Sequence, residues 1–147
     1  MESGTPPRDT TWAMSQENVE IVRRLITEIW GGKTGQPDLA TRVHPQIEIV
    51  TSTDFPEQAV LRGLPGFEEW TRRWSELFED YDLQPERFWE AGERVVVALH
   101  ERGKWGRSGI PFDDHYAHVW TFLSGVVVRV QVFRNQEEAL EAAGLRE

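Results

Sequence analysis

Cysteine is absent from this chain of 147 residues, so the chain can form no disulfide, no thiolate nucleophile and no thiolate-bound metal site. A reducing cytoplasm suits such a composition, and we predict that location. No apolar run approaches the roughly 18 residues that a membrane-spanning helix needs. The N-terminus also lacks the basic, apolar and small-residue order of a signal peptide. We therefore expect no membrane partner.

Basic residues are scarce as well. The chain has 16 Lys and Arg against 25 Asp and Glu, which gives a formal net charge of −9. Because affinity for nucleic acid rests mainly on cationic contacts to phosphate, we expect no nucleic-acid partner. The four histidines are scattered along the sequence, and no glycine loop of phosphate-binding type follows a predicted strand. We therefore expect that the protein binds no metal and no cofactor. We expect its partner to be a small apolar metabolite.

The residues that are present support a single globular domain. Apolar residues make up 39% of the chain, and seven tryptophans supply bulk for a core. Residues 1–13 lack periodicity and are rich in turn formers, which predicts a flexible N-terminal tail. The remaining residues, 14–147, are predicted to form one domain.

Apolar residues at helical spacing predict three helices in the first half of the chain. Their predicted starts are Ser15, Pro37 and Pro65. Val43 is expected to face inward from the second helix, and Phe78 to end the aromatic stripe of the third. Residues 46–51 alternate like a half-buried strand, and residues 52–64 read as a loop.

β-Branched and aromatic residues predict strands in the second half. The first two cover residues 82–90 and 94–104, and a hairpin over 111–133 follows with its turn at Ser124 and Gly125. Asn135, three residues before Glu138, predicts the capped start of a short last helix. Helices gathered early and an antiparallel meander late indicate an α+β fold.

Direct pairing about the turn predicts two different faces for this hairpin. It places Tyr116 opposite Phe133, His118 opposite Gln131, and Trp120 opposite Arg129, so one face is aromatic with polar groups set into it. We expect that face, together with the third helix, to line a pocket; the predicted lining residues are Trp70, Trp74, Tyr116, Trp120, Gln131 and Phe133. The other face is expected to be aliphatic and to form a homodimer contact; its residues include Ala117, Val119, Val128, Val130 and Val132.

His118 is the first candidate for catalysis, because an imidazole on the mixed face could transfer protons near neutral pH. The alternative of equal weight is a buried neutral histidine, satisfied by Gln131 or a backbone group. Asp114 is a further catalytic candidate on the same face: it lies roughly 13 Å along the strand from His118, too far to orient the ring directly, but a bent strand could still place both on one cavity. His100 is the next candidate, although the loop after its strand leaves its facing open by one residue. His115 and His118 point to opposite faces and cannot share a metal.

Several local strings resemble the SnoaL-like branch of the nuclear transport factor 2-like superfamily. They are Met14-Ser15-Gln16-Glu17-Asn18-Val19-Glu20, Arg62-Gly63-Leu64-Pro65-Gly66, Ala91-Gly92-Glu93-Arg94-Val95-Val96-Val97, His118-Val119-Trp120-Thr121, and Glu138-Ala139-Leu140-Glu141-Ala142-Ala143-Gly144-Leu145. The resemblance covers roughly residues 14–146 and implies a cone: a strongly bent, mostly antiparallel sheet wrapped around the N-terminal helices and enclosing a pocket. It also implies a homodimer, because many members pack sheet against sheet.

The resemblance extends to several activities, including ketosteroid isomerases, polyketide cyclases, dehydratases, epoxide hydrolases and non-catalytic binding modules. The isomerase pattern has an aspartate where this chain has Val50 and a tyrosine where it has Leu25, and its second acid falls near His118. Ketosteroid isomerase is therefore disfavoured. Two hypotheses follow: acid–base isomerase, cyclase or lyase chemistry on an apolar oxygenated metabolite, or a non-catalytic ligand-binding or dimerisation module of the same fold.

Overall fold

A bent six-stranded sheet forms the centre of the molecule in the computed structural model, which describes residues 16–27, 42–51 and 60–145. The strand order is β2-β1-β6-β5-β4-β3; β1 runs parallel to β6, and every other neighbouring pair is antiparallel. Residues 16–27 form an N-terminal helix. The other elements are β1 (Val43–Val50), β2 (Val60–Arg62), α3 (Gly63–Leu77), β3 (Phe78–Ala91), β4 (Arg94–Trp105), β5 (Pro111–Leu123), β6 (Val126–Phe133) and α4 (Gln136–Ala142).

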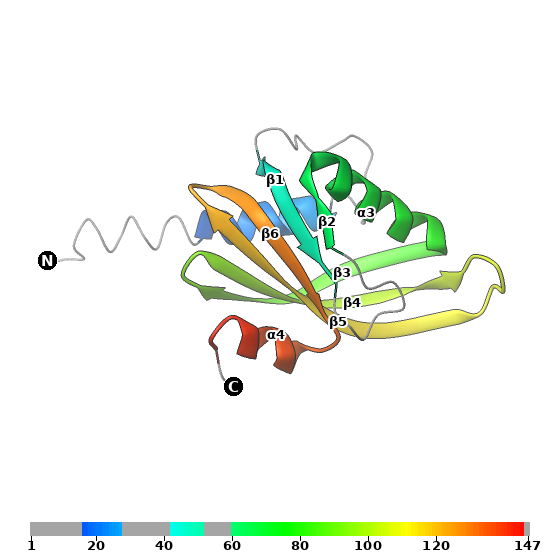
Figure 1. Cartoon of the computed structure of the whole chain (residues 1–147). Helices are drawn as coiled ribbons and strands as arrows, with labels where there is room; N and C mark the ends of the chain where they lie inside the picture. The colour runs from blue at the N-terminus through cyan, green and yellow to red at the C-terminus, as the bar shows by residue number, and fades with distance from the viewer. Residues whose placement is uncertain (1–15, 28–41, 52–59, 146–147) are drawn as a thin grey trace, which may run out of the picture.

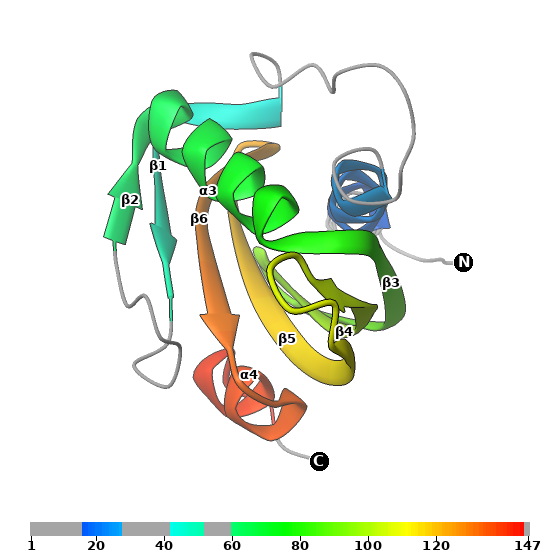
Figure 2. The same ribbon diagram turned by 90° about the vertical axis from the view of Figure 1, so that its right-hand side faces the viewer.

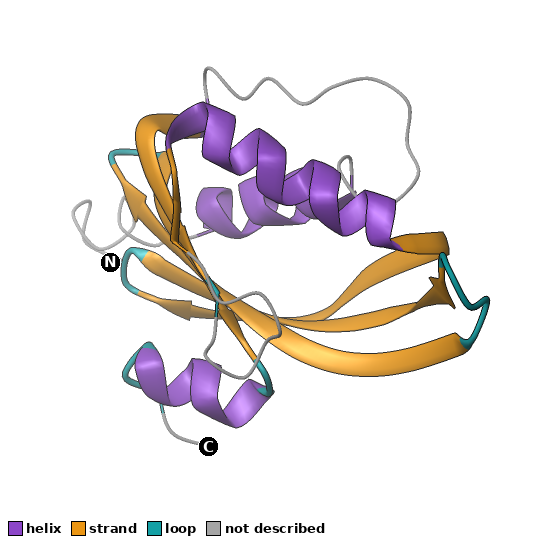
Figure 3. Cartoon of the chain, turned by 45° about the vertical axis from the view of Figure 1, so that its right-hand side comes forward, coloured by secondary structure: helices purple, strands orange, loops and turns teal. Residues whose placement is uncertain are grey.

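The helices lie on both sides of this sheet. The N-terminal helix and α3 cover one face, which we call the inner face, and α4 lies against the opposite, outer face (Figures 1, 2 and 3). The predicted α+β class, with a bent and mostly antiparallel sheet around the N-terminal helices, is thereby confirmed. Among the described residues, no helix is long and apolar enough to cross a membrane.

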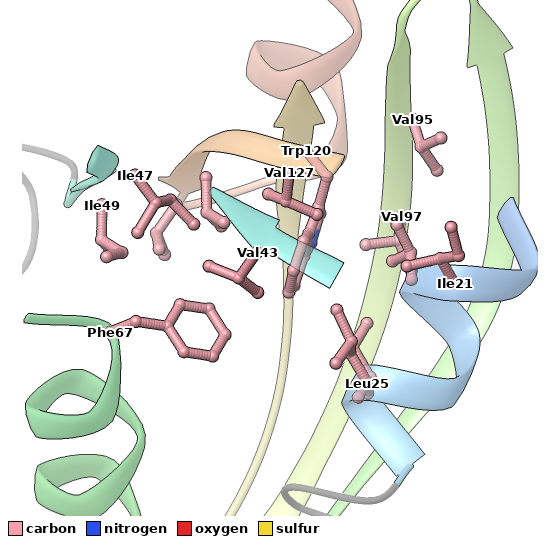
Figure 4. Packing of buried hydrophobic residues seen from close by; sticks show 14 of the residues in the cluster. Ile21, Leu25, Val43, Ile47, Ile49, Phe67, Val95, Val97, Trp120 and Val127 are labelled. Carbon is pink, nitrogen blue, oxygen red and sulfur yellow. The ribbon is translucent and has the colours of Figure 1, made fainter. Parts of the chain in front are cut away.

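The main core fills the space between the inner face and its two helices. Ile26 on the N-terminal helix, Ile47 on β1, Phe67 on α3 and Trp120 on β5 are all fully buried there. Figure 4 shows these elements contributing apolar side chains to one continuous cluster. Complete burial of one such side chain contributes about 1.5–3 kcal/mol, so this cluster is the principal stabilising feature of the fold.

A second, smaller core joins α4 to the outer face. Val96 on β4 and Val119 on β5 pack there against Leu140 of α4. The helix begins as predicted, because the Oδ1 atom of Asn135 accepts a hydrogen bond from the backbone N–H of Glu138 at 2.9 Å.

The hairpin turns at the predicted residues, but its register differs from the prediction. Ser124 and Gly125 both have positive φ, 51° and 83°, as a two-residue turn of type I′ requires. Phe122 pairs with Val127, yet Thr121 pairs with Arg129, so Val128 is an extra residue in β6. This β-bulge moves every residue after it to the other face.

The bulge corrects the predicted division between the two faces of the hairpin. Val130 pairs with Trp120 and Val132 with His118, so both valines belong to the inner core. Gln131 pairs with Val119, and Phe133 pairs with Ala117 and packs in the outer core. The five residues of the predicted aliphatic face therefore do not share one face; homodimer formation stays a prediction.

Three boundaries also differ from the sequence-based expectation. Val43 is the buried first residue of β1 and not part of a helix, and the short strand β2 lies within the predicted loop 52–64. Phe78 opens β3 and does not end α3. The predicted tail 1–13, the helix expected after Pro37 and the side chain of Trp74 lie outside the described residues.

Candidate functional site

The candidate site lies on the inner face, where alternate residues of β4 and β5 point toward the helices. Val97 of β4 lies opposite His118, and Leu99 lies opposite Tyr116. Glu101 is the next inward residue of β4, so a carboxylate continues a row of aliphatic side chains. Glu101 is only 8% exposed, and together with Tyr116 and His118 it places polar atoms in an otherwise apolar layer.

His118 is fully buried and surrounded by aromatic rings. Its Nδ1 atom accepts a hydrogen bond from the Trp120 indole N–H at 3.1 Å, so the neutral ring carries its hydrogen on Nε2. The ring centroids of Trp70, Tyr116 and Trp120 lie 5.6, 5.4 and 5.8 Å from that of His118. This environment holds the imidazole in one orientation.

Burial lowers the pKa of His118 from 6.5 to about 3. An imidazole with this pKa is neutral near pH 7, and protonating it there would cost several kcal/mol. The geometry favours the alternative of a buried neutral histidine. Its hydrogen-bond partner is Trp120 and not Gln131, which the sequence suggested. His118 as the proton carrier stays a prediction that this environment disfavours.

Glu101 is better placed than His118 to act as an acid–base group. Together with two tyrosines it forms what we call the Tyr81–Glu101–Tyr116 cluster. The Tyr81 hydroxyl donates a hydrogen bond to Glu101 Oε1 at 2.7 Å, and the side chains of Tyr81 and Tyr116 are themselves hydrogen-bonded. Burial, and then the negative charge of Glu101, raise the pKa of Tyr116; burial, Tyr116 and Glu101 raise that of Tyr81. Both phenols therefore remain protonated hydrogen-bond donors.

Aromatic side chains connect this cluster to the molecular surface. The Phe78 ring stacks on Tyr81 with centroids 5.0 Å apart, and Phe112 lies 4.6 Å from Phe78. Trp105 contacts both phenylalanines and is 44% exposed. Along the inner face, Glu101 thus lies between the level of the buried His118 ring and an aromatic group that reaches solvent at Trp105.

The structure places the other predicted residues in different surroundings. Asp114 lies opposite Glu101 on β5 and is exposed, so it shares the strand level of the site. His100 points to the outer face, where its ring stacks on that of His115 with centroids 4.3 Å apart. His100, His115 and Glu86 hold ligand atoms within 4.8 Å of one another. Two of the four histidines, which are far apart in the sequence, therefore lie side by side in the structure.

Glu101 and Tyr81 were missed by reasoning from the sequence. The spacing of Val95, Val97 and Leu99 does point to Glu101 as the next inward position. The intervening residues Val96 and Ala98 are buried as well, and Val96 packs against α4, so they are apolar. The strand therefore lacks the alternation of polar and apolar residues that would have shown which side chains point inward.

Comparison with known proteins gives a fold and no activity. No protein-family model matches the chain, and no curated protein matches it. A crystal structure described as a SnoaL-like polyketide cyclase from Jannaschia sp. CCS1 superposes with a TM-score of 0.72 and 20% identity, covering 90% of each chain. An NTF2-like protein from Burkholderia xenovorans LB400 gives a TM-score of 0.66 and 24% identity, covering 88% of this chain and 96% of the other.

A third structure, TerC co-crystallised with polyporic acid, gives a TM-score of 0.65 and 19% identity, with 87% and 98% of the chains covered. At such identities the likeness concerns the course of the backbone, and the same fold carries many unrelated functions. The predicted fold is confirmed by these superpositions. The chain therefore has the fold of the SnoaL-like proteins of the nuclear transport factor 2-like superfamily.

Proposed function

We propose that this protein binds a small, apolar, oxygenated molecule against its inner sheet face and acts on it by acid–base chemistry, with Glu101 as the proton acceptor. The observation that carries the proposal is a carboxylate that is 8% exposed and held by the Tyr81 hydroxyl at 2.7 Å. Removing a carboxylate from water is costly, and buried ionisable groups with specific partners are concentrated at functional sites.

Tyr116 supplies the complementary electrophilic group, because the single hydroxyl hydrogen of Tyr81 is already donated to Glu101. A phenol that stays protonated can donate a hydrogen bond to a ligand carbonyl and stabilise the negative charge that develops on its oxygen. Glu101 then takes a proton from the neighbouring carbon and returns it to another atom of the same molecule. The proton is conserved within the cycle, so the step is an isomerisation or a ring closure and requires no co-reactant.

Two neighbours of the same fold support the class of ligand. One is described as a SnoaL-like polyketide cyclase, and TerC was co-crystallised with polyporic acid. The neutral state of His118 supports placing the reactive carboxylate at Glu101. A non-catalytic ligand-binding module is the second candidate, because the apolar surroundings of Glu101 would suit retention of a ligand without turnover.

The test is a thermal-shift screen of hydroxylated aromatic ketones and quinones, followed by variants on each hit. Glu101→Gln removes the carboxylate, Tyr81→Phe removes the hydroxyl that contacts it, and Glu79→Gln is the matched control on the exposed side of β3. Retained binding with at least 100-fold slower turnover in Glu101→Gln would support catalysis. Loss of binding in both cluster variants would assign a binding module, and binding and turnover that both equal those of the Glu79→Gln control would refute the proposal.

A further inference from the structure

We infer that the outer face carries a binding site for a divalent transition-metal ion of the zinc, nickel or cobalt type, formed by Glu86, His100 and His115. These three residues come from β3, β4 and β5 respectively. We call them the outer-face triad. The triad lies on the side of the sheet opposite to Glu101 and plays no part in the function proposed above.

The strand register brings the two histidines together. His100 and His115 are direct cross-strand partners in the antiparallel β4–β5 pair, and both point to the outer face. Their rings stack with centroids 4.3 Å apart and planes 5° from parallel. Two neutral imidazoles at adjacent strand positions are ligands that late first-row divalent ions prefer.

A β-bulge supplies the carboxylate. Pro85 pairs with Leu99 and Arg87 pairs with Ala98, so Glu86 is an extra residue in β3 with no partner across the strands. Bulges redirect side chains, and this one places the Glu86 carboxylate beside both histidine rings. Its Oε2 atom lies 3.7 Å from His100 Nδ1, and its Oε1 atom lies 3.6 Å from His115 Nε2.

These separations suit shared coordination. Two ligands of one tetrahedral zinc ion at its usual bond lengths are about 3.4 Å apart. The ligand atoms of the triad all lie within 4.8 Å of one another, so small side-chain shifts would close the site. The stacked rings hold their lone pairs in parallel planes, and His115 must turn about its χ2 torsion to share an ion. It is free to do so, because its side chain is 63% exposed and this torsion is soft.

Asp113 adds an independent indication. His100 Nε2 lies 2.6 Å from Asp113 Oδ1, and a carboxylate oxygen accepts hydrogen bonds, so whenever the ring is neutral its hydrogen is held on Nε2 and the Nδ1 lone pair faces Glu86. A metal-binding histidine commonly donates its other N–H to a carboxylate in this way. The nearby Arg102 is paired with Asp82 at 3.4 Å, so it is directed to a different carboxylate.

The charge balance of the site points the same way. With both rings neutral, Glu86 and Asp113 give the group two negative charges that a divalent cation would neutralise. The three ligands leave coordination positions open to water. Bound metal would join β3, β4 and β5 at one level of the sheet.

The experiment is calorimetric titration of untagged protein with Zn²⁺ and with Ni²⁺ at pH 7.5, on the full chain and on single variants. We expect one ion per chain at micromolar affinity, and a rise of about 5–10 °C in the unfolding midpoint at a free ion concentration 100 times the dissociation constant. His115→Gln and Glu86→Gln should each weaken binding at least 10-fold. Asp113→Asn should also weaken it, by about 10- to 100-fold, because Asp113 orients His100.

His44→Gln is the matched control, since it removes one histidine from β1, away from the triad. Circular dichroism and the metal-free unfolding midpoint check that each variant is folded. Affinity weaker than 1 mM for both ions would overturn the inference. It would also be overturned if His44→Gln weakened binding as much as His115→Gln, or if one ion bound per two chains, which would assign the ion to a contact between copies.

Discussion

Replacement of His118 by glutamine provides a direct test of the buried neutral imidazole. The ring is fully buried, and its only titration in the folded protein is displaced by burial to about pH 3. Glutamine does not titrate, and its side-chain oxygen can accept the hydrogen bond that Trp120 donates to His118 in the wild type. The variant therefore removes the proton-binding site while keeping an acceptor for the indole.

The magnitude follows from linkage between protonation and folding. The pKa of His118 falls from 6.5 in the unfolded chain to about 3 in the folded one, so between these values the unfolded state binds more protons. The stability that His118 contributes is fully present above pH 6.5 and is lost as pH falls toward 3. The slope is about 1.4 kcal/mol per pH unit, or about 5 kcal/mol over the whole window.

The assay is urea unfolding at pH 7.5, 6.5, 5.5 and 4.5, with wild type and His118→Gln compared at each pH. Other titrating groups are common to both proteins, so the difference in unfolding free energy isolates His118. The wild type should lose about 0.5–1.4 M in urea midpoint per pH unit below 6.5 relative to the variant. His44→Gln, which removes a surface histidine of β1, controls for the loss of one imidazole. Parallel pH profiles for wild type and His118→Gln would refute the buried neutral state.

Three further substitutions test the packing around this site and the local signals in the sequence. Trp120→Phe removes the indole N–H that is donated to His118 and should lower the unfolding free energy by about 1–3 kcal/mol. The control Trp105→Phe, at a partly exposed ring, should change the unfolding free energy by less than about 1 kcal/mol. Equal effects of the two substitutions would contradict the role of the hydrogen bond. Asn135→Ala removes the cap of α4 and should cost about 1 kcal/mol in chemical denaturation, whereas Asn135→Asp should retain most of that stability. Gly125→Ala places a Cβ at a φ of +83° and should cost about 1–2 kcal/mol; an unchanged midpoint would show that the turn adopts another conformation.

Features fixed by neighbouring residues were predictable from the sequence. The turn at Ser124 and Gly125 depends on a backbone that glycine allows, and the start of α4 depends on the Asn135 side chain reaching an N–H three residues away. The α+β class followed from the order of helical and strand periodicities. In each case, the interactions span a few residues, so local chemistry is sufficient to specify them.

Features fixed by distant contacts were not predictable. The extra residue Val128 shifts the pairing of β6 by one position, and no local signal distinguishes it among three consecutive valines. That shift moved Gln131 and Phe133 off the face of His118. Glu101 was overlooked because α4 buries the alternate residues of β4 and so removes the polar alternation that reveals facing.

The sequence by itself determined the class of fold, the turn, the cap and the presence of an imidazole on the inner face of β5. Only the tertiary structure decided what that imidazole can do, because a pKa depends on the groups packed around the ring and not on its neighbours in the chain. The rings of Trp70, Tyr116 and Trp120 exclude water from His118 and keep it neutral. The same packing brings Tyr81 and Glu101, 20 residues apart in the chain, into one hydrogen bond.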